Sequence, residues 1–168
     1  MGYDLPAAIG AAFAYPRKRI ILITGDGSIQ MNLQELQTIV HHRLPIKIFM
    51  LNNDGYQAIK IAQDNYFKKR YGTDSKHGIS FPDMQKICRA YQIKSFKISH
   101  QLNLKNKLRQ VLNTTGPVFC EIIMPPDQPL IPKPFSIIKP DGSFVNKPLE
   151  DMFPFLDRKE FFKNMFIT

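Results

Sequence analysis

The sequence predicts an α/β domain with an open parallel sheet that carries helices on both faces, followed by a proline-rich C-terminal tail. Segments 20–24 and 46–51 are β-branched or bulky throughout, which is typical of strands buried on both faces. Between them, the apolar residues of segment 32–42 recur at the spacing of one helix face. A strand, a helix and a strand in this order form a βαβ unit, whose two strands are parallel and end at the same edge of the sheet.

Further helices and strands extend this unit along the chain. Residues 5–15 form a predicted helix rich in alanine, which permits close packing against another backbone. Residues 57–67 form a predicted helix that turns Ile59, Ile61 and Ala62 inward. After a polar loop, the remaining predicted elements are a helix at 81–91, a strand at 95–98, a helix at 102–112 and a strand at 117–123. The prolines at 125 and 126 end this alternation, so the predicted domain spans residues 1–126.

The tail, residues 127–168, differs from the domain in composition. Its prolines predict an extended segment with a turn at 140–143, and a helix is predicted at 158–165. Unlike a disordered tail it is rich in phenylalanine, so it is expected to pack on the domain or on a partner.

Composition excludes several classes of function. The net charge of +9 comes from scattered basic residues without a nucleic-acid motif, so no nucleic-acid partner is expected. No apolar run approaches the roughly 20 residues of a membrane span, and no signal peptide is recognisable, which predicts a cytoplasmic protein. Cys88 and Cys120 fall in a predicted helix and a predicted buried strand, so reduced core thiols are expected.

Polar, glycine-containing turns follow the first two strands, at 25–28 and 52–56. Open α/β sheets bind ligands at this edge. The Asp26 carboxylate, the Asn53 amide oxygen and the Gly55 carbonyl form an all-oxygen set suited to Mg²⁺, which commonly completes its shell with phosphate oxygens and water. The sequence therefore predicts a bound diphosphate held through a metal ion.

The first turn also offers groups that contact such a diphosphate directly. Gly25 and Gly27 allow the backbone to approach it, and Gly27 and Ser28 supply N–H and hydroxyl donors near the start of the following segment.

Three other nucleotide- or metal-binding motifs fail on the same residues. A dinucleotide fingerprint requires a third glycine where Gln30 stands. An EF-hand loop ending at the second turn requires acidic residues where Met50 and Ile61 stand. A P-loop requires Gly-Lys-Ser/Thr, which does not follow Gly25.

The spacing of the two turns carries a family resemblance. Gly-Asp-Gly, 24 residues and then Asn-Asn resembles the thiamine diphosphate motif of acetolactate synthases and pyruvate decarboxylases. The resemblance implies that Asp26, Asn53 and the Gly55 carbonyl hold the metal that anchors the cofactor's diphosphate. Tyr56, in the same turn, is included among the cofactor-binding residues with Gly25, Gly27 and Ser28.

Two apolar residues receive roles from the same resemblance. The opening segment MGYDLPAAIGA is similar to a segment of acetolactate synthases in which the methionine supports the bent conformation of the cofactor, which implies that role for Met1. Ile59 stands where pyruvate decarboxylases carry a glutamate beside the reactive carbon. An apolar residue there shields a carbanion from protonation, which suits decarboxylation of a 2-keto acid with carboligation.

The resemblance covers only the diphosphate-binding half of such an enzyme. The other half supplies a catalytic glutamate to the cofactor's pyrimidine, and none of Glu35, Glu121, Glu150 and Glu160 has that context. The chain is therefore expected to be inactive alone and to need a pyrimidine-binding domain or subunit in a homo- or hetero-oligomer. Three hypotheses follow. The chain is expected to be a fragment or split gene product of an acetolactate synthase-like enzyme, the natural small subunit of a two-chain 2-keto acid decarboxylase or ligase, or a non-catalytic remnant or interaction module.

Overall fold

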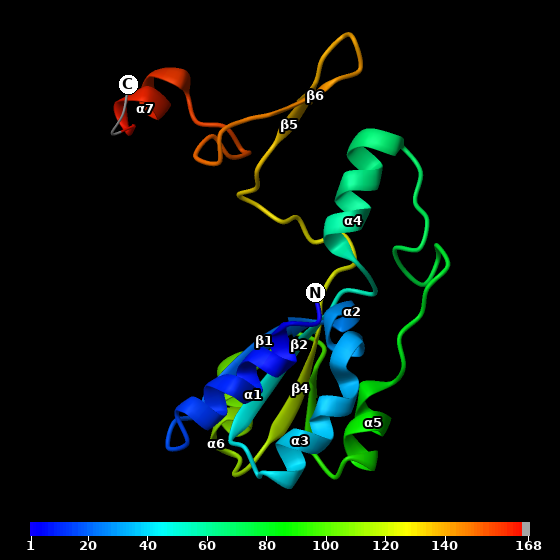
Figure 1. Cartoon of the computed structure of the whole chain (residues 1–168), viewed down its shortest axis with the longest axis vertical. Helices are drawn as coiled ribbons and strands as arrows, with labels where there is room; N and C mark the ends of the chain where they lie inside the picture. Colours follow the sequence, from blue (N-terminus) through cyan, green and yellow to red (C-terminus); the bar gives the residue numbers. More distant parts are fainter. Residues whose placement is uncertain (166–168) are drawn as a thin grey trace. The chain divides into compact units, whose positions relative to one another are not determined.

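A parallel four-stranded sheet forms the centre of the N-terminal part of the chain (Figure 1). The computed structural model describes residues 1–165. Its strands are β1 (Ile20–Gly25), β2 (Ile46–Asn52), β3 (Lys94–Ile98) and β4 (Val118–Ile123), in the spatial order β1-β2-β4-β3. β1 and β2 are parallel neighbours, with Gly25 paired to Leu51 at their carboxyl ends. The predicted α/β fold and the adjacency of the two turns are confirmed.

Helices cover both faces of this sheet (Figure 1). One face packs against α1 (Asp4–Ala14), α3 (Leu36–His41) and α5 (Met84–Ala90), and the other packs against α6 (Leu104–Asn113). Cys88 lies in the first core and Cys120 in the second, and both are free and buried, as expected. None of the helices in residues 1–165 is long and apolar enough to cross a membrane.

The helical segment after β1 begins earlier than predicted. The expected start was residue 32, but α2 (Asp26–Ile29) follows β1 directly, and a 3₁₀ segment (Gln30–Glu35) joins it to α3. Asn32 interrupts the helical geometry with φ −136° and donates its side-chain amide to the Gly2 carbonyl. The apolar periodicity does not show this start, because the first turn of the helix contains glycine and serine. Gly27 and Ser28 therefore belong to the first turn of a helix.

The helix after β2 has the predicted extent but not the predicted face. α4 (Gln57–Ala62) continues into a π-helical turn (Gln63–Phe67). The inward orientation expected of Ile59 is wrong, because its side chain is 39% exposed while Lys60 is only 1% exposed. Hydrophobicity alone assigns lysine to solvent, but the Lys60 ammonium donates hydrogen bonds to the carbonyl oxygens of Asn53 and Pro126.

The chain divides into two compact units, with the boundary between Gln128 and Pro129. The second unit contains an antiparallel hairpin of β5 (Ser136–Ile138) and β6 (Phe144–Asn146), and a helix α7 (Arg158–Lys163). The hairpin closes around the turn predicted at 140–143, and α7 ends two residues before the predicted end at 165. Whether this unit packs on the domain or on a partner stays a prediction.

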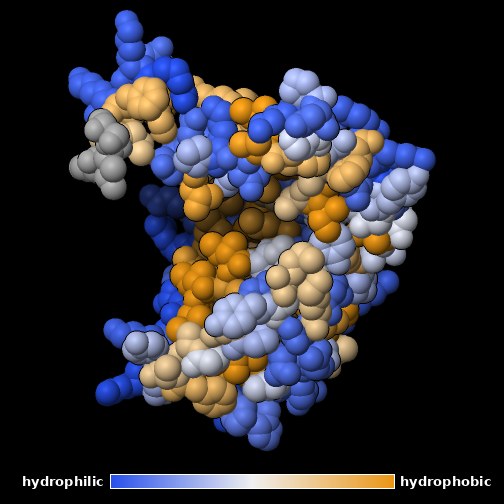
Figure 2. Space-filling view, turned by 45° about the horizontal axis from the view of Figure 1, so that its top comes forward, coloured by the Kyte–Doolittle hydropathy of each residue, from blue (hydrophilic) through white to orange (hydrophobic). Residues whose placement is uncertain are grey.

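Apolar side chains of β1 reach the surface of the first unit. Ile21 and Ile23 are 54% and 66% exposed, on the edge strand of the sheet. Ile23 pairs in register with Phe49, which belongs to the core under α6, so both isoleucines lie on the α6 face. Hydrophobic surface is also visible on the face of the molecule in Figure 2. Parallel sheets are normally covered on both faces. Here the helix on the α6 face does not extend over β1.

Candidate functional site

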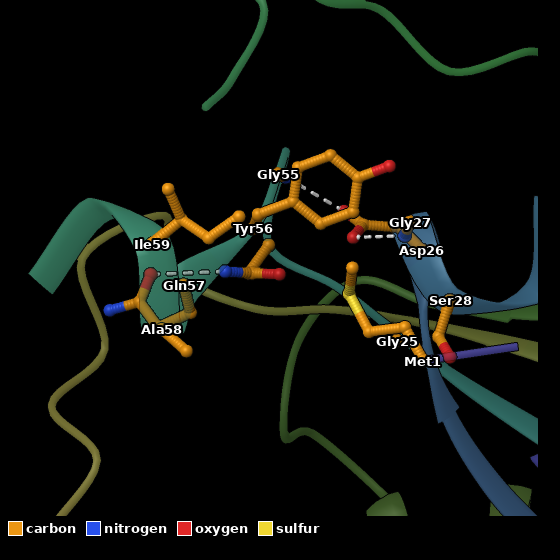
Figure 3. A pocket seen from close by; sticks show the side chains of 11 residues that line it. Met1, Gly25, Asp26, Gly27, Ser28, Gly55, Tyr56, Gln57, Ala58 and Ile59 are labelled. Carbon is orange, nitrogen blue, oxygen red and sulfur yellow. Dashed lines mark hydrogen bonds between the residues drawn. The ribbon is translucent and has the colours of Figure 1, made fainter. Parts of the chain in front are cut away.

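A pocket of about 220 Å³ lies where the ends of β1 and β2 meet the start of α4 (Figure 3). It brings together residues from the chain start, the two turns and α4. The lining residues are Met1, Gly25, Asp26, Gly27, Ser28, Asn53, Gly55, Tyr56, Gln57, Ala58 and Ile59. Every site residue predicted from the sequence lies in this set.

Asp26 is the charged group of the pocket, and it is only 2% exposed. Its Oδ1 accepts a hydrogen bond from the Gly27 amide at 2.7 Å, and its Oδ2 accepts one from the Gly55 amide at 3.0 Å (Figure 3). Burial raises the pKa of Asp26, and the hydrogen bonds from these amides oppose that rise. In residues 1–165, no cationic side chain lies within ion-pair distance of this carboxylate. A carboxylate keeps free lone pairs after two hydrogen bonds, so it can still bind a cation.

Asn53 and Gly55 present oxygen atoms on the other side of the pocket. The Asn53 side-chain NH₂ donates to Gln57 Oε1 at 3.1 Å, which leaves its Oδ1 as the group available to a ligand. Gly55 adopts φ +140°, and a Cβ there would lie 2.0 Å from the Thr73 carbonyl oxygen, so only glycine fits. Sequence reasoning missed Gln57, and no motif marks it; its role follows from the hydrogen bond that orients Asn53.

The two glycines of the first turn serve different purposes. A Cβ on Gly25 would meet no atom within 4 Å, which leaves an open surface where a ligand can approach the backbone. A Cβ on Gly27 would lie 2.2 Å from Cε1 of Tyr56. The Tyr56 ring is itself held edge-on against Phe81, with ring centroids 5.6 Å apart. Gly27 is therefore required by the packing of Tyr56, a reason that differs from the predicted approach of a diphosphate.

Apolar groups enter the pocket from two sides (Figure 3). The Met1 side chain projects from the side of the first turn, and Ala58 and Ile59 come from α4 opposite it. The Gly2 amide donates to Ser28 Oγ at 2.9 Å, which ties the start of the chain to the first turn. The Ser28 hydroxyl still has its own proton to donate to a ligand.

The glutamates of the chain lie elsewhere. Glu35 accepts a hydrogen bond from Thr38, while Glu121 accepts one from Asn52 and pairs with Lys97 at 3.1 Å. None of the glutamates is among the described residues that line the pocket.

A family model connects this pocket to a known class of enzymes. The model described as "Thiamine pyrophosphate enzyme, C-terminal TPP binding domain" matches residues 1–122, which include both turns and the whole sheet except the last residue of β4. The chain belongs to the thiamine pyrophosphate enzyme family.

Relatives of this thiamine pyrophosphate-binding domain are acetolactate synthases. The chain is 40% identical over 124 residues to the acetolactate synthase large subunit of Cyanidium caldarium, which covers 74% of the chain and 21% of the relative. It is 35% identical over 137 residues to acetolactate synthase 2, chloroplastic, of Nicotiana tabacum, covering 79% and 21%. With the acetolactate synthase isozyme 3 large subunit of Escherichia coli it shares 38% identity over 112 residues, covering 67% and 19%. The chain thus spans about a fifth of the length of these relatives.

The pocket fits the cofactor for which the family is named. Thiamine diphosphate carries an anionic diphosphate, and the open backbone at Gly25 and the Ser28 hydroxyl offer it an approach at the first turn of α2. The buried Asp26 carboxylate would repel that anion directly, and a cation between them would remove this repulsion.

Proposed function

We propose that this chain is the thiamine diphosphate- and Mg²⁺-binding part of an acetolactate synthase-like enzyme that decarboxylates a 2-keto acid and joins the product to an acceptor. The observation that supports this most strongly is the convergence of Asp26, Asn53 and Gly55 on one pocket from the ends of two adjacent parallel strands. In this proposal the Asp26 carboxylate, Asn53 Oδ1 and the Gly55 carbonyl bind Mg²⁺. The diphosphate and water complete the coordination of the ion.

Each remaining residue of the pocket has a task in this proposal. When bound, thiamine diphosphate supplies a carbon nucleophile that adds to the keto group and accepts the electron pair released with CO₂. Gly25 leaves space for the diphosphate, and the Ser28 hydroxyl donates a hydrogen bond to it. Met1 supports the cofactor from one side. Ile59 offers no proton at the opposite wall and excludes water there, which favours joining to an acceptor over release of an aldehyde.

The proposed enzyme needs a second domain or subunit. No glutamate is found among the described lining residues, so the group that activates the cofactor's pyrimidine has to come from elsewhere. The exposed Ile21 and Ile23 on the edge strand provide an apolar surface that a partner domain can cover. We therefore propose a homo- or hetero-oligomer in which a pyrimidine-binding domain completes the site.

Calorimetric titration of the chain with thiamine diphosphate tests the proposal. Binding is expected only with Mg²⁺ present, and it is expected to be weak because the pyrimidine contacts are missing. A chelator in excess should abolish the heat of binding, and Mg²⁺ in excess should restore it. Tight binding that ignores the chelator would contradict the metal site, and no binding at millimolar cofactor with Mg²⁺ would contradict the proposed function.

A further inference from the structure

We infer that Lys60 and Asp74 are positioning residues that hold the turn at 53–55 in the shape that brings the Gly55 amide to Asp26. The inference deepens the proposed function and rests on it for its significance, because this turn carries two of the three proposed metal ligands. Neither residue lines the pocket, and neither belongs to the proposed metal-binding set.

Lys60 is among the largest of the fully buried side chains in the described part of the chain, with 1% exposure. Its Nζ lies 3.3 Å from the Asn53 carbonyl oxygen, 3.2 Å from the Pro126 carbonyl oxygen and 3.9 Å from Asp74 Oδ2. The ammonium group donates hydrogen bonds to the two carbonyl oxygens, and the Asp74 carboxylate lies at ion-pair distance and balances its charge. A buried lysine is costly unless it is compensated in this way, and here the compensation joins the turn to α4 and to the segment after β4.

Asp74 organises the loop that follows α4, and it is 4% exposed. Its Oδ1 contacts His77 Nδ1 at 2.5 Å and accepts the Lys76 amide at 3.1 Å. Its Oδ2 accepts the Thr73 hydroxyl at 3.2 Å and lies 3.7 Å from Arg70 Nη1. Burial raises the pKa of Asp74, but the hydrogen bonds from His77 and Thr73 outweigh burial and hold the pKa below its ordinary value. Four residues of segment 70–77 thus contact the one charged carboxylate of Asp74.

The loop at 70–77 makes direct hydrogen bonds to the turn at 53–55 and to Tyr56, which follows it. The Tyr56 amide donates to the Thr73 carbonyl at 2.9 Å, and the Ser75 hydroxyl donates to Asp54 Oδ2 at 2.5 Å. Asp54 and Gly55 have φ of +58° and +140°, so both lie in the left-handed region. Such conformations persist when the surroundings over-determine them. Lys60 holds the turn through the Asn53 carbonyl, and the loop holds it through the Tyr56 amide and the Asp54 side chain.

Lys60→Met tests this role, with Lys47→Met as its matched control. Lys47 is also buried, at 3% exposure, and its Nζ donates to the Thr114 carbonyl and, at 2.6 Å, to the Gly116 carbonyl. It stands at the start of β2, whereas the turn follows the end of β2. Both variants lose a buried ammonium that binds two backbone carbonyls, but only one of them touches the turn.

The first readout is amide hydrogen exchange of Gly55 and Tyr56 in the ligand-free chain, compared with the amides of β4. Lys60→Met is expected to speed exchange at the turn about 10-fold or more beyond its effect on β4. Lys47→Met is expected to change turn and strand alike. Asp74→Asn provides a second variant and is expected to reproduce the selective effect of Lys60→Met. Equal acceleration of turn and strand in both Lys60→Met and Asp74→Asn would overturn the inference.

The second readout is the affinity for Mn²⁺, followed by electron paramagnetic resonance in the presence of thiamine diphosphate. Lys60→Met is expected to weaken Mn²⁺ binding about 10-fold or more, and Lys47→Met less than about 2-fold. Equal weakening by the two variants would count against the positioning role. If the unaltered chain binds no Mn²⁺, the proposed function fails, while the exchange of Gly55 and Tyr56 still decides whether Lys60 and Asp74 hold the turn.

Discussion

The backbone amide of Gly55 donates a hydrogen bond to Asp26 Oδ2 at 3.0 Å, although the two residues are 29 positions apart in the sequence. Parallel pairing of β1 with β2 brings the two turns together, and this hydrogen bond closes the gap between them. The bond uses the Gly55 amide and leaves its carbonyl to a ligand. The proposed metal site depends on this contact, because it places the carboxylate and the second turn side by side.

Asp26→Asn should weaken metal binding strongly while the chain stays folded. It removes the only carboxylate among the described residues that line the pocket, so Mn²⁺ affinity is expected to fall on the order of 100-fold. Asp54→Asn is the control, because Asp54 stands in the second turn but does not line the pocket, and asparagine keeps a side-chain oxygen that can accept the Ser75 hydroxyl. Its affinity should change by less than about 3-fold. Equal Mn²⁺ titrations for the two variants would contradict the assignment of Asp26.

Gly25→Ala and Gly27→Ala should separate binding from stability. An added methyl at Gly25 meets no protein atom, so stability should stay within about 0.5 kcal/mol while thiamine diphosphate binding weakens. At Gly27 the methyl would collide with the Tyr56 ring, and a loss of about 1–3 kcal/mol in the free energy of unfolding is expected.

Denaturant unfolding and calorimetry measure the two effects. The double variant Gly27→Ala with Tyr56→Ala should be less destabilised than the sum of its single changes, because the collision is gone. If the free-energy changes of the two single variants simply add in the double variant, packing against Tyr56 is not the reason why residue 27 must be glycine.

Cys88 and Cys120 should resist thiol reagents in the native chain. Burial raises the pKa of Cys88 to about 12 and that of Cys120 to about 11, and both side chains are 0% exposed. The reactive thiolate is therefore scarce at pH 8 and shielded as well. Labelling followed by absorbance should be slow in buffer and complete for both thiols in guanidinium chloride. Rapid labelling of either cysteine in buffer would contradict its position in the core.

The C-terminal unit should loosen in acid through Asp151. This carboxylate accepts hydrogen bonds from Lys147 Nζ at 2.8 Å and from both terminal nitrogens of Arg158 at 2.9 Å. The bonds from Arg158 and then Lys147 hold the pKa of Asp151 below its ordinary value. Its contribution to stability is therefore fully present above about pH 3.9 and is lost as the pH falls through the lower folded-state value.

Nuclear magnetic resonance can follow this acid transition through the ring protons of Phe135 and Phe155, whose centroids lie 5.6 Å apart. Their shifts should move toward unfolded values in acid. Asp151→Asn should show the loosened shifts already at neutral pH, with little further change on acidification. A variant that keeps the same acid transition would show that Asp151 does not cause it.

The bounds of the strands and helices could be predicted wherever the pattern of apolar residues lies within the element itself. The strand at 20–24 and its partner at 46–51 were found because a run of bulky residues favours a strand without reference to the rest of the chain. The predicted burial of segment 20–24 on both faces is wrong, because Ile21 and Ile23 are exposed where the helix of the α6 face does not reach the edge strand. The start of α2 at Asp26 was missed because its first turn contains two polar residues and a glycine, which carry no apolar periodicity. The hairpin of β5 and β6 was missed for a related reason, since each strand has only three residues.

The sequence by itself determined the family and most of the pocket residues, because the motif consists of two short turns at a fixed spacing after two strands. Only the tertiary structure decided why Gly27 must be glycine and why Lys60 is buried in place of Ile59. Those answers lie in Tyr56 and Pro126, which are 29 and 66 residues away along the chain. Periodicity reports how apolar a residue is, whereas a clash with a ring or a hydrogen bond to a distant carbonyl exists only after distant segments have packed together.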